Sequence, residues 1–174
     1  MSSALEADEG AVGSGDALRH VMSAFIAGVT IVSTIWEGVA HAMTATAFSS
    51  VSLEPPLVLV CVSRKSRFHA AVLGAGRWAV SLLRSDQEQI ARHFANRGRD
   101  LKTQFNQVAH RPAPASGAPL IDGAHAWLDC ETLATYEGGD HTIVVGHVVR
   151  ASREAPSGWP LAYYRGSYLD PIGT

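Results

Sequence analysis

Residues 41–63 read HAMTATAFSSVSLEPPLVLVCVS, and no other stretch says as much about the fold. The apolar run Leu57 to Val62 predicts a buried strand that begins after a Pro-Pro turn. The first half of the stretch mixes small alanines with hydroxyl residues: Thr44, Thr46, Ser49 and Ser50. Such short donors beside a sheet suit a ligand with planar amide edges and phosphate oxygens, which is the profile of a flavin nucleotide. A loop that satisfies its own backbone through Ser and Thr turns would have a similar composition, so both interpretations stay open here.

Composition limits the classes of protein to which the chain can belong. Its 174 residues favour one domain that buries most of its apolar surface. The formal net charge of −2 argues against a nucleic-acid partner, which usually needs a basic face. The two cysteines, Cys61 and Cys130, lie in strand-like patterns without CxxC spacing, so we expect free thiols and no metal site.

The chain shows no membrane or export signal. No apolar run approaches the roughly 20 residues of a membrane span, and the N-terminus lacks the basic start and apolar core of a signal peptide. We therefore expect a cytoplasmic protein that does not bind membranes. Residues 1–15 are small, polar and acidic, which predicts a disordered tail before a domain over 16–174.

The first third of the domain predicts a helix and a hairpin. From Asp16 onward, apolar residues follow the spacing of one helix face, and Gly28 is placed to end this helix. The residues of that face are Leu18, Val21, Met22, Phe25 and Ile26. The β-branched residues 29–36 then predict a strand, and Glu37-Gly38 a turn into a second strand that reaches Thr44.

The middle of the chain alternates helix and strand signals. Ser66 can cap a short helix over Arg67–Leu73, and residues 78–83 predict another strand. Residues 85–88 resemble a capping box that opens a further helix. Residues 97–119 hold charges, prolines and glycine, and this composition predicts a long surface loop.

The last third is again rich in strand signals. Residues 126–136 and 141–149 alternate around the turn Glu137-Gly-Gly-Asp140, and residues 161–164 would form the final strand. Roughly six or seven hairpin-connected strands with short helices favour a mainly β fold, a Greek-key-like antiparallel barrel. No glycine pattern of a Rossmann or P-loop site is present.

Five ordered motifs carry a family resemblance. They are FIAGVTIV (25–32), MTATAFSSVS (43–52), PPLVLVC (55–61), GDHTIVVGHV (139–148) and YRGSY (164–168). With them, the chain resembles the flavin reductase family, the small components of two-component flavin-dependent monooxygenases, which have an FMN-binding split-barrel fold. The resemblance implies an enzyme that uses NADH or NADPH to reduce FMN or FAD by hydride transfer. It also implies a homodimer that releases reduced flavin to a partner monooxygenase.

The resemblance assigns a flavin-binding role to two segments. In the first segment, the residues that would line the isoalloxazine ring and ribityl chain are Thr44, Ala45, Thr46, Ala47, Ser49 and Ser50. Family members often carry Asn and Ser where this chain has Thr46 and Ala47, so backbone groups would take a larger share here. In the second segment, Lys65, Ser66 and Arg67 would hold the flavin phosphate, because a helix N-terminus with neighbouring cations favours an anion.

Three further residues match positions that approach the flavin in relatives. Cys61 would lie below the ring, and Phe94 and Arg97 would approach from the helix that follows the capping box. Cys61 and Phe94 as ordinary core residues are open alternatives.

The nicotinamide site is expected at Gly139, Asp140 and His141, with Tyr168 covering the pocket. A histidine near its usual pKa can bind the carboxamide or phosphate without transferring a proton, since hydride passes directly from nicotinamide C4 to flavin N5. The alternatives are that His141 only stabilises the turn and that Tyr168 only covers the core. His147 shares a strand face with His141, but no carboxylate or cysteine stands at ligand spacing, so we reject a metal site.

Two other functions remain open from the sequence. One is a flavin-binding split-barrel protein without reductase activity, acting in storage, sensing or as a partner subunit. The other, an oxidase of a phosphorylated vitamin or a haem binder, leaves the Gly139-Asp140-His141 turn without a purpose. FMN versus FAD, and NADH versus NADPH, have no readable code in the sequence.

Overall fold

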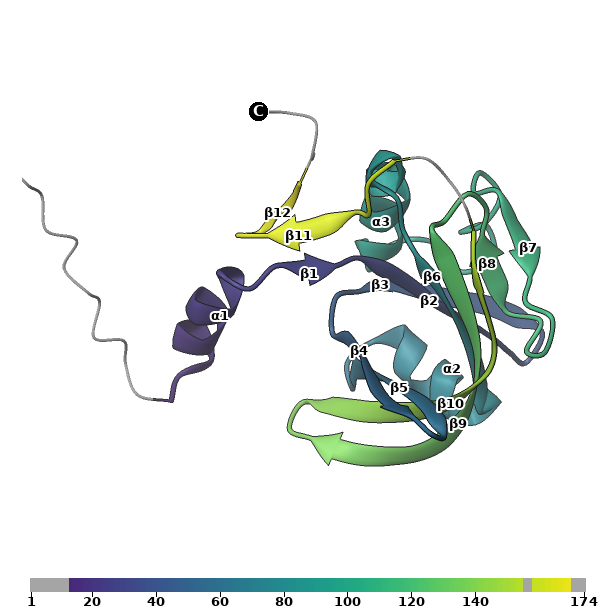
Figure 1. Cartoon of the computed structure of the whole chain (residues 1–174), viewed down its shortest axis with the longest axis horizontal. Helices are drawn as coiled ribbons and strands as arrows, with labels where there is room; N and C mark the ends of the chain where they lie inside the picture. The colour runs from purple at the N-terminus through teal and green to yellow at the C-terminus, as the bar shows by residue number, and fades with distance from the viewer. Residues whose placement is uncertain (1–12, 155–157, 170–174) are drawn as a thin grey trace, which may run out of the picture.

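The computed structural model describes residues 13–154 and 158–169 (Figure 1). It confirms a mainly β fold with short helices. The helices are α1 Gly15–Ser23, α2 Arg67–Ala75 and α3 Glu88–Ala95, with a 3-10 turn, η1 Ser85–Gln87, before α3. The strands are β1 Ala27–Gly28, β2 Thr30–Trp36, β3 Val39–Ala45, β4 Phe48–Leu53, β5 Pro56–Ser63, β6 Arg77–Leu82, β7 His110–Pro112, β8 Pro119–Ile121, β9 Ala126–Gly138, β10 His141–Arg153, β11 Ala162–Tyr164 and β12 Ser167–Leu169.

Seven strands form one antiparallel sheet in the order β3-β2-β6-β9-β10-β5-β4. Its two edge strands, β3 and β4, follow each other in the chain, yet within the described residues no ladder joins them. The sheet curls so that these edges approach each other (Figure 1). It therefore stays open at the short link formed by Thr46 and Ala47, which is the arrangement expected of a split barrel.

The apolar run of β5 explains why this strand lies inside the sheet. Val58, Val60 and Val62 are buried, and the strand pairs with β4 on one side and β10 on the other. Phe68 and Val72 of α2 pack into the same core cluster, so α2 fills the concave side of the sheet. The start of α2 is thereby fixed next to the end of β5.

The helix starts depend on side-chain caps, one of them predicted correctly. Ser66 Oγ accepts a hydrogen bond from the N–H of Phe68 at 3.1 Å, as expected for the cap of α2. The capping interaction predicted over 85–88 lies one residue earlier, over 84–87. There the Gln87 side chain accepts a hydrogen bond from the N–H of Arg84 at 3.0 Å. Glu88 instead pairs with Arg92 one helical turn further on, at 2.6 Å.

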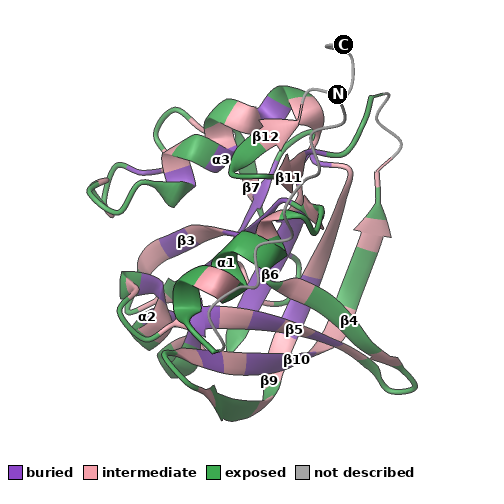
Figure 2. Ribbon diagram, turned by 90° about the vertical axis from the view of Figure 1, so that its left-hand side faces the viewer, coloured by how far each residue is buried: buried purple, intermediate pink, exposed green. Residues whose placement is uncertain are grey.

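The N-terminal helix differs from the prediction. It ends at Ser23 and not near Gly28, because Ala27 and Gly28 form β1 and pair with β11. None of its residues is buried, and Figure 2 shows its exposed surface. Of the tail expected over 1–15, residues 1–12 lie outside the described part of the chain, and Gly15 already belongs to α1.

Some strands escaped the sequence analysis. The serine-rich β4 pairs with β5 through an irregularity between Ser50 and Ser52, and the expected loop 97–119 contains β7 and ends at β8. These three strands were missed because β4 alternates irregularly, and because β7 and β8 have only three residues each, too few to show a period. Among the described residues, no helix is both long enough and apolar enough to cross a membrane.

Candidate functional site

A cavity of about 400 Å³ opens where the two sheet edges meet. Five parts of the chain enclose it: β3 with the link to β4, the end of β5, the start of α2, the end of α3 with the segment that follows it, and the start of β10. Its lining residues are His41, Ala42, Met43, Thr44, Ala45, Thr46, Ala47, Cys61, Ser63, Lys65, Ser66, Arg67, Phe68, Phe94, Ala95, Arg97, Arg99, Leu101 and His141. Both segments to which the sequence assigned flavin contacts therefore reach one cavity, together with His141.

The link between β3 and β4 presents mainly backbone to the cavity. Thr44 Oγ1 donates to the carbonyl of Ala91 in α3 at 2.6 Å, so this hydroxyl ties α3 to β3. The carbonyl of Ala47 accepts from the N–H of Cys61 at 3.0 Å, which closes the link against β5. The small side chains of Ala45 and Ala47 leave room for a flat ligand close to the chain.

Positive charge in the cavity is not balanced by carboxylates. Lys65, Arg67, Arg97 and Arg99 line it, while no Asp or Glu does, and within the described residues none of the four forms an ion pair. The N-terminus of α2, capped by Ser66, adds its free N–H groups. Cations and a helix N-terminus at one place attract an anion such as a phosphate.

Two arginines build the wall opposite β5. Arg67 donates from Nη2 to the carbonyls of Arg97 and Arg99, each at 2.8 Å, and so ties α2 to the segment after α3. The Arg99 guanidinium donates to the carbonyls of Ala42 and Asn96 and lies 5.4 Å from the centre of the Phe94 ring. Burial, and then the charge of Arg67, lower the pKa of Arg99 to about 10. Arg99 thus stays charged near neutral pH.

His141 begins β10 at the rim of the cavity. Its Nδ1 lies 2.7 Å from Asp140 Oδ1, and its register partner on β5 is Ser63. The hydrogen bond with His141, and then the charge of that ring, lower the pKa of Asp140. Gly139 adopts a φ of 66°, which the tight turn requires. Gly139 and Asp140 shape the turn and do not line the cavity.

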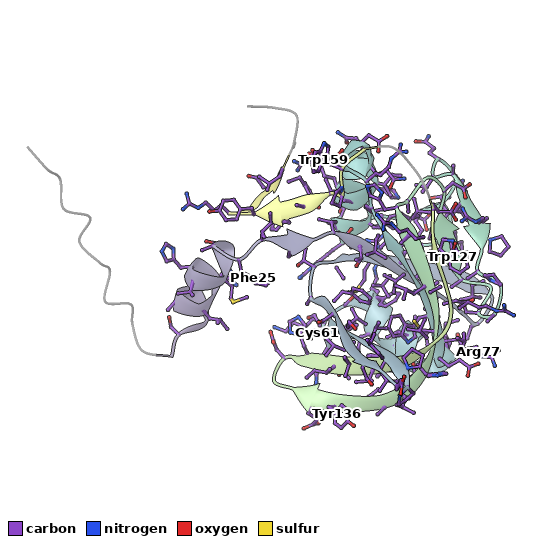
Figure 3. All side chains as sticks on the ribbon, in the orientation of Figure 1. Phe25, Cys61, Arg77, Trp127, Tyr136 and Trp159 are labelled. Carbon is purple, nitrogen blue, oxygen red and sulfur yellow. The ribbon has the colours of Figure 1, made fainter. Side chains whose placement is uncertain are left out.

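A second, larger cavity of about 920 Å³ shares Thr46, Ala47 and Cys61 with the first. It lies between α1, the β11–β12 hairpin and strands β4 and β5. Phe25 and Cys61 both line it, and Figure 3 shows them on the two sides of this space. Ser49 lines this second cavity and not the first.

Besides Gly139 and Asp140, two further predicted site residues, Ser50 and Tyr168, line neither cavity. Ser50 pairs with Val58 inside the β4–β5 ladder. Tyr168 packs edge-on against Tyr163, with ring centres 5.2 Å apart, and Arg92 lies 5.0 Å from the centre of its ring. Tyr168 therefore packs against the core beside α3 in the single chain, and its contact with the nicotinamide pocket stays a prediction.

The sequence analysis assigned no role to several cavity residues. The ones that carry polar groups are His41, Ser63 and Arg99. Arg99 belongs to a basic cluster visible in the sequence, and His41 directly precedes the segment with the alanines and threonines. In the part of the chain that the structure describes, no group of three or more His, Cys, Asp or Glu side chains is arranged for a metal ion.

Fold and cavity together define a class: antiparallel β proteins with a cavity lined by cationic side chains at the open edge of a curled sheet. The family model described as "Flavin reductase like domain" matches residues 22–170. The chain belongs to the flavin reductase family.

Curated relatives and solved structures agree with this assignment. The chain is 45% identical over 144 residues to an NADH-dependent FAD reductase of Streptomyces globisporus, covering 82% of this chain and 76% of the relative. It is 39% identical over 159 residues to the reductase component of 4-hydroxyphenylacetate 3-monooxygenase from Thermus thermophilus, covering 88% and 94%. The structure of the S. globisporus NADH:FAD oxidoreductase SgcE6 superposes with a TM-score of 0.85 at 40% identity, covering 94% of this chain and 96% of SgcE6. BorF, the flavin reductase component of a bacterial tryptophan halogenase, gives a TM-score of 0.84 at 39% identity, covering 90% and 97%.

Proposed function

We propose that this protein is an NADH-dependent flavin reductase that reduces FMN or FAD and supplies the reduced flavin to a partner monooxygenase. The observation that carries the proposal is the set of four cations, without a carboxylate, that lines a cavity beside the α2 N-terminus. A flavin nucleotide brings the negative phosphate charge that this cavity lacks. NADH as the donor and a monooxygenase as the partner are supported by the names of the relatives.

The flavin supplies the redox chemistry when it is bound, as the acceptor of a hydride. The protein binds and orients it. Lys65, Ser66 and Arg67 hold the phosphate, with Arg97 beside them. The backbone of residues 45–47 and Cys61 lie against the ring, whereas the Thr44 hydroxyl remains on α3.

His141 binds the nicotinamide in this proposal. The Asp140 carboxylate can only accept, so the Nδ1 of His141 carries the proton of their 2.7 Å hydrogen bond. The other ring nitrogen, Nε2, then remains available to hydrogen-bond the carboxamide of the nicotinamide. The second cavity, which meets the first at Thr46, Ala47 and Cys61, gives room for the donor beside the flavin ring.

The proposal includes a homodimeric split barrel in the cytoplasm, where NADH is found. The apolar side chains of α1 and of the residues just after it support the dimer, because in a single chain Leu18, Val21 and Phe25 are 64–66% exposed. Contiguous exposed apolar surface of this kind usually marks an interface. The cavity binds the phosphate end that FMN and FAD share, so both flavins fit the proposal.

Steady-state oxidation of NADH and NADPH, followed with added FMN, FAD or riboflavin, tests the proposed function. We expect flavin-dependent turnover that saturates in both substrates. No turnover with any combination contradicts the proposal. Stoichiometric flavin binding without nicotinamide oxidation would instead identify a flavin-binding protein that lacks reductase activity.

A further inference from the structure

His41 occupies a fixed place at the wall of the first cavity. It lies on the edge strand β3, and the carbonyls on both sides of it are occupied. Gln104 Nε2 donates to the carbonyl of Ala40 at 2.7 Å, and the Arg99 guanidinium donates to that of Ala42. The segment after α3 therefore holds β3 on either side of His41, so the imidazole cannot move far from the cavity.

The imidazole has no polar partner of its own. The His41 side chain lines the cavity and the residue is only 7% exposed. Its Nδ1 is buried without a hydrogen bond, and among the described residues no side-chain hydrogen bond involves its Nε2. Trp36 lies at one side, with ring centres 6.2 Å apart. The Nδ1 atom is shielded from the cavity, whereas Nε2 is not among the buried unpaired atoms. Nε2 is therefore the ring nitrogen that a ligand in the cavity can reach.

The charges around His41 define the chemistry of that ligand. The charged groups that face it from the elements packed against β3 are Arg67 of α2 and Arg99 of the segment after α3. Burial first, and then these two cations, lower the pKa of His41 from its ordinary value of 6.5. The ring is therefore neutral near pH 7 in the free protein, with one N–H to donate. Two cations and one neutral donor form a site for an anion.

We propose that His41 donates a hydrogen bond from a ring nitrogen to a phosphate oxygen of the bound flavin nucleotide, beside Arg67 and Arg99. This role rests on the proposed function, because it places a flavin in the first cavity. The position along β3 supports the phosphate as acceptor. His41 lies four residues, about 13 Å of extended chain, from Ala45 at the ring-contacting link. A flavin that extends along β3 from Ala45 toward His41 spans a distance of this order when part of the ring is counted together with the ribityl chain.

A negative phosphate beside His41 has a second consequence. It reverses the local field, so flavin binding raises the pKa of His41 above its value in the free protein. Between the two pKa values the complex holds more protons than the free protein, and binding tightens as the pH falls through that window. FAD is the suitable ligand for this measurement, since the second ionisation of the FMN phosphate, near pH 6, would overlap with it.

The test compares three flavins on three variants. His41→Phe keeps a ring of similar size without the N–H donor, and His41→Asn keeps a donor that does not titrate. We expect His41→Phe to raise the Kd of FMN and FAD by about tenfold or more, and that of riboflavin by less than about twofold. His41→Asn should recover part of the loss. The matched control is His125→Phe, because His125 also has a buried ring nitrogen without a partner but lines neither cavity.

Calorimetry of FAD binding, in buffers of different ionisation enthalpy around pH 6.5, provides the second readout. The unmodified protein should take up protons on binding, and both His41 variants should take up fewer. An equal loss of riboflavin and FMN affinity in His41→Phe, or equal proton uptake by all forms, overturns the role of His41. If the unmodified protein turns over flavin while the variants bind FMN normally, only this role fails. If it binds no flavin, the proposed function itself fails.

Discussion

At the residue scale, the site depends on which polar groups are already occupied inside the protein. Thr44 satisfies the backbone of α3, and Ser66 caps α2, although the sequence marks both as ligand donors. His141 has one ring nitrogen bound to Asp140, while its other faces no protein partner in the described chain. Local sequence reveals that a donor exists, but only the folded chain reveals whether it is free.

Replacement of His141 by Ala tests its role in binding the nicotinamide. The variant lacks the imidazole that hydrogen-bonds the carboxamide, so we expect the KM for NADH to rise about tenfold while the KM for flavin changes less than about twofold. Steady-state kinetics with each substrate varied in turn provides the measurement. His147→Ala, on the same strand but outside both cavities, is the control and should leave both constants unchanged. Equal increases in the two constants would contradict the assignment.

At the element scale, the edge strand β3 is hydrogen-bonded to part of the segment 97–119. The composition of 97–119 predicts a surface loop, and most of its first part is indeed exposed. Yet Arg99 and Gln104 donate to the outward carbonyls of β3, which as an edge strand has no neighbour on that side. The segment thereby protects the sheet edge and supplies two cations to the cavity.

Gln104 carries much of this connection. It is 2% exposed, donates to the carbonyls of Ala40 and Leu101, and accepts from Arg99 Nε at 2.9 Å. Gln104→Met leaves buried groups without partners, so we expect the free energy of unfolding to fall by about 1–3 kcal/mol. Urea denaturation measures the loss. Gln107→Met, at an exposed amide of the same segment, should change stability by less than about 0.5 kcal/mol. Equal losses in both variants would show that Gln104 has no special role.

At the scale of the whole molecule, the single chain leaves its N-terminal helix largely uncovered. Figure 1 shows α1 standing apart from the main sheet, linked through β1. Its apolar residues have the spacing of a core-facing helix, but none is buried. A second copy of the chain that covers α1 would explain both facts, and it would add a wall to the second cavity, which Met22 and Phe25 line.

Size-exclusion chromatography with light scattering tests the dimer. The unmodified protein should elute as a dimer, and the double variant Val21→Glu with Phe25→Glu should shift it to a monomer, because burying two carboxylates at an interface is unfavourable. Ile35→Glu, at an exposed apolar position of β2 that lines neither cavity, should leave the dimer intact. A monomeric unmodified protein, or a dimeric double variant, would contradict this proposal.

The sequence by itself determined the features that depend on short-range signals. Alternation and apolar runs indicated most of the long strands, Ser66 indicated the start of α2, and the turn before His141 indicated its place at a strand end. The alanine and threonine link and the cations after β5 were also readable, because they are contiguous. Together with the family resemblance, these signals predicted most of the residues that line the cavity.

Only the tertiary structure decided which distant groups meet. His41, Arg99 and Leu101 join the site because the segment after α3 lies against the edge of β3, a contact between residues more than fifty positions apart. It also decided that the Thr44 hydroxyl is bonded to α3 and that the partly buried Tyr168 packs against a core cluster. Periodicity and turn signals describe a chain locally, whereas the pairing of polar groups and the closure of a cavity depend on which surfaces pack together.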